Sequence, residues 1–409
     1  MSPRRSLWLI FLTIAVDALG FAILLPVIPQ LLTNPASPHY VLPPGTSREL
    51  GVFLLGCLIA AFPLMQFFAT PILGQLSDRY GRKPVLVASL AGTAVATAAF
   101  AAGIVTRNVP LLFVARACDG LTGGNVSVAH AVIADVTEPK DRTKSFGLAM
   151  GAFGTAMIFG PFLGGTLADS GLVSWFDAAT PFWFAAAIAA LNTLSVWFLL
   201  PETRMPSRTP LELGRNLKNL ARAYARPQLR PIFLTSFLVM AGNGIFIAFF
   251  GAFLVDRHGW NERQIGRFFG YMGICVIFTQ FVTLRRMAKR FAEPDVLRVV
   301  IVCTATLVVG YVLPIAWWTM FLIAPFISTC NGLAIVNLQG LLSRTAGPDT
   351  QGEVMGINSS LQALAMAVPP LAAATVASAL APAAAVLGAA LCHLFAWLAF
   401  VTLYREARV

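Results

Sequence analysis

Twelve long apolar segments constrain what this chain can fold into. A helix needs about 20 mostly apolar residues to cross the hydrocarbon core of a bilayer. The segments that meet this requirement are 6–31, 50–75, 85–105, 110–136, 145–168, 181–200, 230–256, 262–285, 295–315, 317–344, 353–378 and 382–403. The chain is 57% hydrophobic and 11% charged, which is too apolar to cover the surface of a soluble protein of this size. This excludes a soluble enzyme, a disordered protein and a nucleic-acid binder, and predicts an all-α membrane protein with twelve transmembrane helices.

The one sizeable break between apolar segments divides the spans into two groups of six. We therefore predict an N-terminal six-helix bundle over 1–200, a cytoplasmic linker over 201–229 and a C-terminal six-helix bundle over 230–409. The two halves also show a weak repeat. A shift of 209 residues aligns Pro139 with Pro348, Gly147 with Gly356 and Pro161 with Pro370. Two pseudo-symmetric bundles around a site near the middle of the membrane are typical of alternating-access transporters.

The basic residues predict the orientation in the membrane. With the N-terminus inside, 23 Lys and Arg residues fall in cytoplasmic segments and five fall in outer segments. Cytoplasmic loops carry an excess of Lys and Arg, so this split places both termini in the cytoplasm. It also explains the net charge of +11 without a nucleic-acid partner.

The loop after the second span carries the most specific motif. Residues 74–84 read GQLSDRYGRKP. This loop resembles the signature loop of the major facilitator superfamily at every defining position. The resemblance implies a cytoplasmic gate made by Gly74, Asp78, Arg79, Gly81 and Arg82, in which Asp78 accepts hydrogen bonds from the N-terminus of the eleventh span and holds the cytoplasmic side closed.

The fourth span contains an arginine, Arg116. An arginine that faces lipid is costly, so Arg116 is expected to face the bundle interior with Asp119, three residues on, as its partner. The segment resembles motif B of the same superfamily. Small residues follow, and they are suited to close helix packing: Gly120, Gly123, Gly124 and Ser127. A purely structural Arg–Asp pair is the alternative to a role in proton coupling.

The fifth span resembles the antiporter motif of the drug-efflux branch. The matching residues include Gly160, Pro161, Gly164 and Gly165. A Gly-Pro pair kinks a helix and lets a neighbouring helix approach closely. The resemblance associates the motif with exchangers, whereas a glycine-rich packing seam is the plain structural alternative.

The first span contains Asp17, and only Asp17 and Asp119 among the 18 acidic residues lie well inside a span. An ionisable residue within a membrane helix marks a functional site by default. We therefore assign proton coupling to Asp17, Arg116 and Asp119. The alternative is an acid that is hydrogen-bonded to its neighbours and never titrates. The segment resembles the first span of tetracycline-efflux proteins, but the third span, 85–105, has no acid, which argues against tetracycline itself as the substrate.

Polar and aromatic residues inside other spans are candidates for lining a substrate cavity. The candidates are Asn125, Asn243, Phe246, Phe250, Asn331 and Gln362. Large apolar cavities with few polar groups suit hydrophobic solutes. For a polar side chain at such a position, an interhelical hydrogen bond is a more common role than contact with a ligand.

The resemblance and the residues together predict a proton-coupled antiporter that exports hydrophobic or amphiphilic small molecules. It would use the proton gradient, need no metal or cofactor, act as a monomer and lie in a bacterial inner membrane. The chain shows no catalytic constellation, so we do not expect an enzyme. A translocase for a lipid or a lipid-linked glycan is the alternative within the same fold. A receptor or scaffold has no need of Asp17 or the gating loop.

Overall fold

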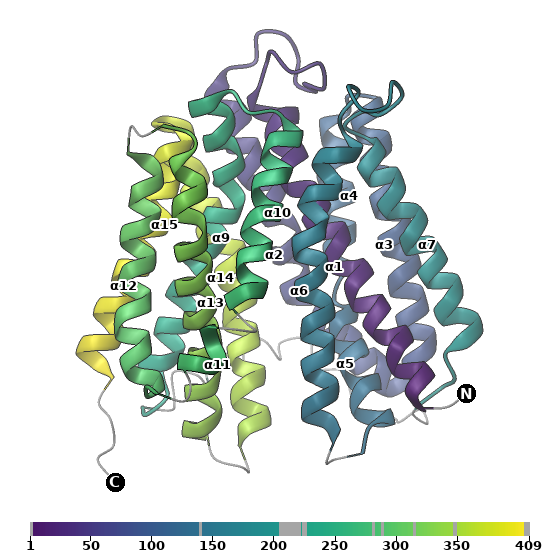
Figure 1. Cartoon of the computed structure of the whole chain (residues 1–409). Coiled ribbons are helices and arrows are strands. Elements are labelled where there is room, and N and C mark those ends of the chain that lie inside the picture. Colours follow the sequence, from purple (N-terminus) through teal and green to yellow (C-terminus); the bar gives the residue numbers. More distant parts are fainter. Residues whose placement is uncertain are drawn as a thin grey trace. The chain divides into compact units, whose positions relative to one another are not determined.

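The computed structural model describes the residues 3–138, 141–203, 222, 227–279, 283–287, 290–313, 316–346 and 350–404. Within these ranges the regular secondary structure is helical throughout (Figure 1). A backbone in hydrocarbon has no water to bond with, so a chain this apolar satisfies its own N–H and C=O groups by forming helices. The predicted all-α fold class is therefore confirmed.

The helices follow the predicted apolar segments closely. In chain order they are α1 Pro3–Thr33, α2 Arg48–Tyr80, α3 Arg82–Val105, α4 Val109–Thr122, α5 Asn125–Val136, α6 Arg142–Leu167, α7 Thr180–Leu199, α9 Arg230–His258, α10 Glu262–Phe278, α11 Leu284–Met287, α12 Glu293–Val312, α13 Thr319–Ala346, α14 Gln351–Ala379 and α15 Pro382–Leu403. Within the described part of the chain, ten helices are long and apolar enough to cross a membrane. The structure thus supports a multi-pass membrane protein.

Two of the twelve predicted spans are covered by shorter helices. The segment 110–136 holds α4 and α5, which are separated at Gly123 and Gly124. The segment 262–285 begins with α10, which ends at Phe278, and residues 280–282 lie outside the described ranges. Neither α4, α5 nor α10 reaches 18 residues, so none of them counts as a span on length alone.

The chain divides into two compact units. Unit 1 comprises Met1–Thr46, Ala61–Arg215 and Trp260–Gly270, and unit 2 comprises Ser47–Ala60, Asn216–Gly259 and Tyr271–Val409. Helices α2 and α10 each contribute to both units. The predicted bundles 1–200 and 230–409 remain a prediction, and most of the predicted linker 201–229 lies outside the described residues.

In unit 1, α1 packs extensively on α6, and α3 packs on α7 and α4. The residues that form its apolar core come from α1, α3, α5, α6 and α7, and they include Ile10, Leu86, Val128, Ala149 and Val196. In unit 2, α9 packs on α15 and α14, and α12 packs on α13 and α15. Each unit therefore has its own layer of helix-to-helix contacts.

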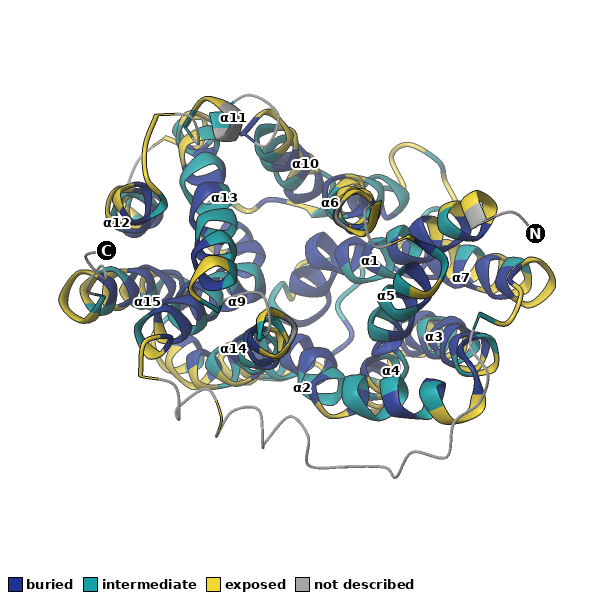
Figure 2. Cartoon of the chain, turned by 90° about the horizontal axis from the view of Figure 1, so that it is seen from below, coloured by how far each residue is buried: buried dark blue, intermediate teal, exposed yellow. Residues whose placement is uncertain are grey.

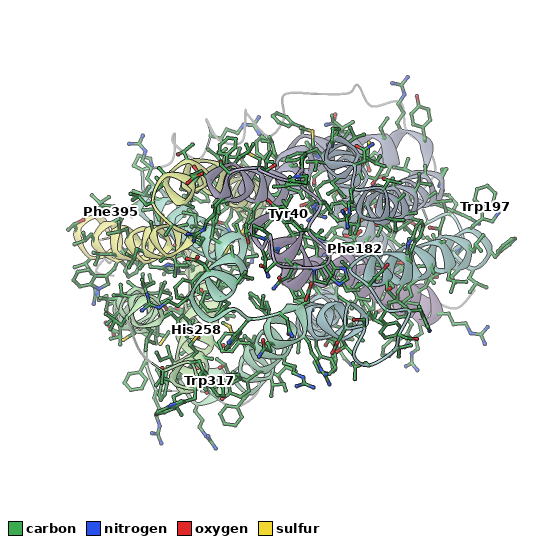
Figure 3. All side chains as sticks on the ribbon, turned by 90° about the horizontal axis from the view of Figure 1, so that it is seen from above. Tyr40, Phe182, Trp197, His258, Trp317 and Phe395 are labelled. Carbon is green, nitrogen blue, oxygen red and sulfur yellow. The ribbon has the colours of Figure 1, made fainter. Side chains whose placement is uncertain are left out.

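The exposed faces of the helices are apolar as well. In Figure 2 exposed residues lie at helix ends and on faces turned away from neighbouring helices. Trp197 on α7, Phe395 on α15 and Trp317 in the turn before α13 are all more than half exposed and point outward, whereas Phe182 is buried among the helices of unit 1 (Figure 3). Large exposed aromatic and aliphatic side chains on so many helices are expected where lipid is the solvent.

Candidate functional site

Asp17 has a defined partner in unit 1. The Nδ2 of Asn125 on α5 donates a hydrogen bond to Oδ1 of Asp17 on α1 at 3.0 Å. Asn125 is 1% exposed. A buried amide that donates to a carboxylate holds that carboxylate in one orientation. Asn125, predicted as a cavity residue, therefore lies beside the predicted proton-coupling acid.

Arg116 is enclosed within the same unit. It is 2% exposed, and its Nη1 lies 2.9 Å from Oδ2 of Asp119. The guanidinium also lies over two aromatic rings, 4.4 Å from the centre of the Phe62 ring and 5.3 Å from that of Phe21. Both contacts stabilise a cation away from water. The predicted pairing of Arg116 with Asp119 is confirmed.

The break between α4 and α5 puts Asn125 at the first position of α5. Gly123 and Gly124 stand between the two helices. The N–H of Gly123 still donates to the carbonyl of Asp119, and Nε2 of Gln66 on α2 donates to the carbonyl of Gly123 at 2.7 Å. A Cβ on Gly124 would lie 2.9 Å from Cα of Thr70, so only glycine allows α2 this close. Asn125 then begins α5. The predicted small-residue strip is confirmed as a packing face against α2.

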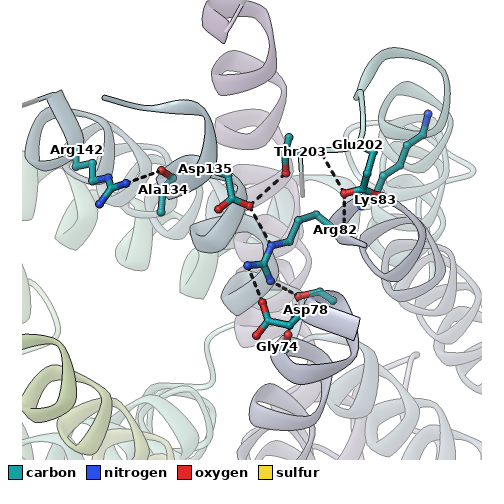
Figure 4. Close-up of polar contacts among 10 residues, drawn as sticks. Gly74, Asp78, Arg82, Lys83, Ala134, Asp135, Arg142, Glu202 and Thr203 are labelled. Atoms are coloured by element: carbon teal, nitrogen blue, oxygen red, sulfur yellow. Dashed lines mark hydrogen bonds and ion pairs between the residues drawn. The ribbon is translucent and has the colours of Figure 1, made fainter. Parts of the chain in front are cut away.

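The loop between α2 and α3 forms a second polar cluster, which is shown in Figure 4. Arg82 is 4% exposed, and its guanidinium makes three contacts. Nη2 lies 2.8 Å from Oδ1 of Asp78, Nε lies 3.1 Å from Oδ2 of Asp135, and Nη1 donates to Oγ of Ser77 at 2.6 Å. Contact with two carboxylates at once requires the planar guanidinium group of arginine, because the ammonium group of lysine lacks this geometry.

The start of α3 is capped from a distant part of the chain. The carboxylate of Glu202 accepts from the backbone N–H of Arg82 at 2.7 Å and of Lys83 at 3.2 Å. Gly81 has φ +101°, and a Cβ there would lie 2.5 Å from Oε2 of Glu202. The first N–H groups of a helix lack partners within the helix, and a carboxylate satisfies them well. Glu202 thus ties the end of the sixth span to the loop.

The other residues of the predicted gate lie at the same end of α2. A Cβ on Gly74 would lie 3.7 Å from Oγ of Ser127, so α2 and α5 meet there. The guanidinium of Arg79 lies 5.4 Å from the centre of the Tyr80 ring. The structure pairs Asp78 with Arg82. Its predicted contact with the eleventh span stays a prediction.

The glycines of the fifth span make backbone contacts within unit 1. Gly160 and Gly164 on α6 pack against Ala22 and Ile23 on α1. Gly165 packs against the part of α10 that belongs to this unit, where a Cβ on Gly266 would lie 3.0 Å from its Cα. The helix α6 continues through Pro161 without interruption. Glycine at these positions lets the backbones of α1, α6 and α10 touch.

The remaining predicted cavity residues lie in unit 2. Phe246 and Phe250 are buried on α9, with ring centres 4.3 Å apart, and Phe250 lies 4.9 Å from Tyr311 on α12. Asn243, Asn331 and Gln362 are partly buried on α9, α13 and α14. The structure brings the two phenylalanines together. The predicted role in binding substrate is untested for all five.

Several residues of these clusters were missed by sequence reasoning. Asp135 and Glu202 lie at the ends of the fourth and sixth spans. Their acidic side chains, in predominantly basic segments that are predicted to be cytoplasmic, are the signal that could have identified them. Phe21 lies four residues after Asp17, on the same helix face. Phe62 carries no such signal, because its position near Arg116 depends on the packing of α2 on α4.

Comparison with known proteins identifies the family. The model of the Major Facilitator Superfamily matches residues 10–370, so this chain belongs to that superfamily. Its similarity lies with the tetracycline-efflux-like branch. The chain is 32% identical over 381 residues to the tetracycline resistance protein, class C, of Escherichia coli, covering 91% of this chain and 89% of the relative. It is 30% identical over 382 residues to the class H protein of Pasteurella multocida, covering 90% and 88%.

Solved structures support the fold. The crystal structure of the human organic anion transporter MFSD10 (TETRAN) matches with a TM-score of 0.69 and 24% sequence identity. The match covers 98% of this chain and 100% of that one. At this identity the likeness concerns the arrangement of helices. The chain is thus a membrane transporter of the major facilitator fold.

Proposed function

We propose that the protein is a proton-coupled antiporter that exports hydrophobic or amphiphilic small molecules by alternating access. The observation that carries this proposal is the polar cluster of unit 1, in which Asp17 is bonded to Asn125 beside the Arg116–Asp119 pair. The similarity to tetracycline resistance proteins over nine-tenths of the chain supports drug efflux as the process.

The cluster supplies what proton coupling requires. Asp17 interacts electrostatically with both Arg116 and Asp119. Charges interact more strongly in a low-dielectric interior than in water, so loading one proton on Asp17 changes the energy of the whole cluster. A proton that arrives from outside neutralises Asp17 and favours one conformation. Its release to the cytoplasm favours the other, and substrate travels in the opposite direction.

The cytoplasmic cluster around Arg82 supplies the conformational element. Arg82 joins the end of α2 to Asp135 at the end of α5, and Glu202 joins the start of α3 to the end of the sixth span. Such a network holds the cytoplasmic ends of α2, α3, α5 and α7 together as one body. We propose that this body is the cytoplasmic gate, with Gly74, Asp78, Arg79 and Gly81 as part of it.

Proton flux in liposomes tests the proposal. Purified protein is reconstituted with an internal pH dye, and lipophilic cations, tetracyclines and lysolipids are added against an imposed pH gradient. Substrate-dependent proton flux is expected from the wild type and not from Asp17→Asn. The matched control is Asp295→Asn, which removes an exposed acid that is paired with Arg298 on α12 and should leave the flux unchanged.

Two outcomes would contradict parts of the proposal. Proton flux that persists in Asp17→Asn would show that Asp17 does not couple, and Asp119→Asn would be tested next. Labelled lipid that crosses between leaflets while no compound moves protons would replace drug antiport with lipid translocation. The same panel of compounds tests whether the protein transports tetracyclines.

A further inference from the structure

The hydrogen bond from Asn125 to Asp17 depends on the charge of the acid. Nδ2 of Asn125 donates to Oδ1 of Asp17 at 3.0 Å, and Asn125 is 1% exposed. The Nδ2 group of an amide only donates, and its bond to an ionised carboxylate is roughly twice as strong as its bond to a neutral acceptor. The contact therefore favours the ionised form of Asp17 over the protonated form.

Few charged groups face Asp17. Arg116 and Asp119 on α4 interact with it electrostatically. Helices α5, α6 and α7 pack on α1, and neither α7 nor α2 between residues 58 and 77 carries a titratable side chain. The titratable residues of α5 and α6, and the other ones of α1, lie toward the end of unit 1 that holds the polar cluster around Arg82: Arg4, Arg5, His130, Asp135, Arg142 and Lys144. Asn125 thus acts on Asp17 without a charge of its own, so its effect can be removed while the net charge of the site stays the same.

Helix α2 fixes the position of Asn125. Oγ of Ser127 on α5 donates to the carbonyl of Thr70 on α2 at 3.1 Å. Nε2 of Gln66 on α2 donates to the carbonyl of Gly123 at 2.7 Å. These two bonds fasten the residues on both sides of Asn125 to α2. A displacement of α2 therefore moves the amide relative to Asp17.

The same helix carries part of the proposed gate. Helix α2 continues from Thr70 to Asp78, and Oδ1 of Asp78 lies 2.8 Å from Nη2 of Arg82 in the polar cluster. Coupling between distant sites is carried by packed side chains and rigid secondary elements. A movement of the gate end of α2 is therefore transmitted along one continuous helix to the contacts that hold Asn125.

We propose that Asn125 is a positioning residue that couples the release of the proton from Asp17 to the position of α2. The inference rests on the proposed proton antiport and identifies how the gate acts on the coupling acid. While α2 holds the amide against Asp17, the carboxylate is stabilised and its proton leaves to water. When α2 carries the amide away, the carboxylate loses a donor in a low-dielectric interior, and Asp17 takes up a proton from water.

Titration of the Asp17 carboxyl tests the role of Asn125. Infrared spectra of protein in nanodiscs, with the Asp17→Asn spectrum subtracted, follow the C=O band of the protonated carboxyl against pH. Asn125→Leu removes the donor and keeps the branched shape of the side chain. We expect this variant to move the midpoint of the band upward by about one pH unit or more, because a hydrogen bond to a charged group is lost. The pH midpoint of substrate-dependent proton flux should move in the same direction.

Asn192→Leu is the matched control. Asn192 on α7 is 3% exposed, and its Oδ1 accepts from Oγ1 of Thr13 on α1 at 3.3 Å, so this variant also removes a buried amide that is bonded to α1. Its midpoint should equal that of the wild type. A wild-type midpoint in Asn125→Leu, or an equal shift in both variants, overturns the role of Asn125. If Asn125→Leu fails to fold, Asn125→Ser gives the same comparison, because its hydroxyl group is too short to reach Asp17.

Gln66→Leu tests the link to α2, since it removes one of the two fastening bonds and leaves the amide of Asn125 unchanged. We expect its midpoint to move upward by less than that of Asn125→Leu, because the bond between Ser127 and Thr70 remains. A wild-type midpoint in Gln66→Leu overturns the coupling to α2. Proton antiport is judged separately, by the liposome flux of the wild type, because the infrared titration requires no transport.

Discussion

Gly81 has the most demanding backbone conformation in the polar cluster around Arg82. Its φ of +101° and ψ of 155° lie in a region that side chains with a Cβ avoid. The carboxylate of Glu202 fills the space where a Cβ would stand. Both features, the positive φ and the lack of a Cβ, allow the carboxylate of Glu202 to reach and cap the first N–H groups of α3.

Gly81→Ala is therefore expected to destabilise the protein by roughly 1–3 kcal/mol. Thermal unfolding in detergent measures the effect as a lower melting temperature. The control is Gly151→Ala on α6, where a Cβ would meet nothing within 4 Å. An unchanged melting temperature in Gly81→Ala would show that the start of α3 can rearrange without cost.

The polar contacts of unit 1 differ in whether they can be predicted from the sequence. Arg116 and Asp119 are three residues apart on one helix, so their pairing follows from helix geometry. The bond between Asp17 and Asn125 joins residues 108 positions apart. No local pattern encodes that bond, because it depends on how closely α1 and α5 approach.

At the scale of elements, the break between α4 and α5 is the main departure from the predicted spans. Hydropathy alone predicts one continuous span over 110–136. The structure interrupts it at Gly123 and Gly124, where Gln66 donates to the carbonyl of Gly123. A break inside a membrane helix is tolerated where a neighbour satisfies the freed backbone groups. A hydropathy average along the chain carries no information about the neighbouring helix that satisfies these groups.

Gly124→Ala is expected to force α5 away from α2, because the added Cβ meets the backbone of Thr70 at 2.9 Å. Overpacking of this kind costs about 1–3 kcal/mol, and it would also displace Asn125 from Asp17. The melting temperature and the substrate-dependent proton flux should both fall. Gly356→Ala on α14, where a Cβ meets nothing within 4 Å, is the control. Wild-type values for Gly124→Ala would exclude a tight α2–α5 contact.

At the scale of the whole molecule, the distribution of basic residues makes a prediction about topology. Alkaline phosphatase fused within 201–229 or after Leu403 should be inactive in bacterial cells, because the positive-inside rule places these sites in the cytoplasm. Fusions within 34–47 or 168–179 should be active. Active phosphatase after Leu403 would contradict the predicted location of the C-terminus.

Helix α10 belongs partly to each unit, which makes a second prediction at this scale. Its first part lies in unit 1, where Nη1 of Arg263 pairs with Oδ2 of Asp169 at 2.8 Å, and its remainder from Tyr271 lies in unit 2. If the first part of α10 moves with the remainder of its helix when the units change position in alternating access, this pair must separate during transport.

A disulfide between Asp169→Cys and Arg263→Cys, made in a chain without the native cysteines, should therefore stop transport, and a reductant should restore it. The control cross-link is Thr93→Cys with Thr122→Cys, whose hydroxyl groups lie 3.0 Å apart on α3 and α4 of unit 1. Transport that continues with 169 and 263 cross-linked would show that this contact stays closed throughout the cycle.

The sequence by itself determined the helical membrane class, the extent of most spans, the loop motif and the Arg116–Asp119 pair. These features are local, because hydropathy and helix periodicity act over a few turns. Only the tertiary structure decided that Asn125 holds Asp17, that Glu202 caps α3 across 120 residues and that α2 fastens the residues on both sides of Asn125. Such contacts depend on which helices touch and how closely they approach. A small residue such as Gly124 allows a close approach, but the sequence around it does not identify the helix that packs there.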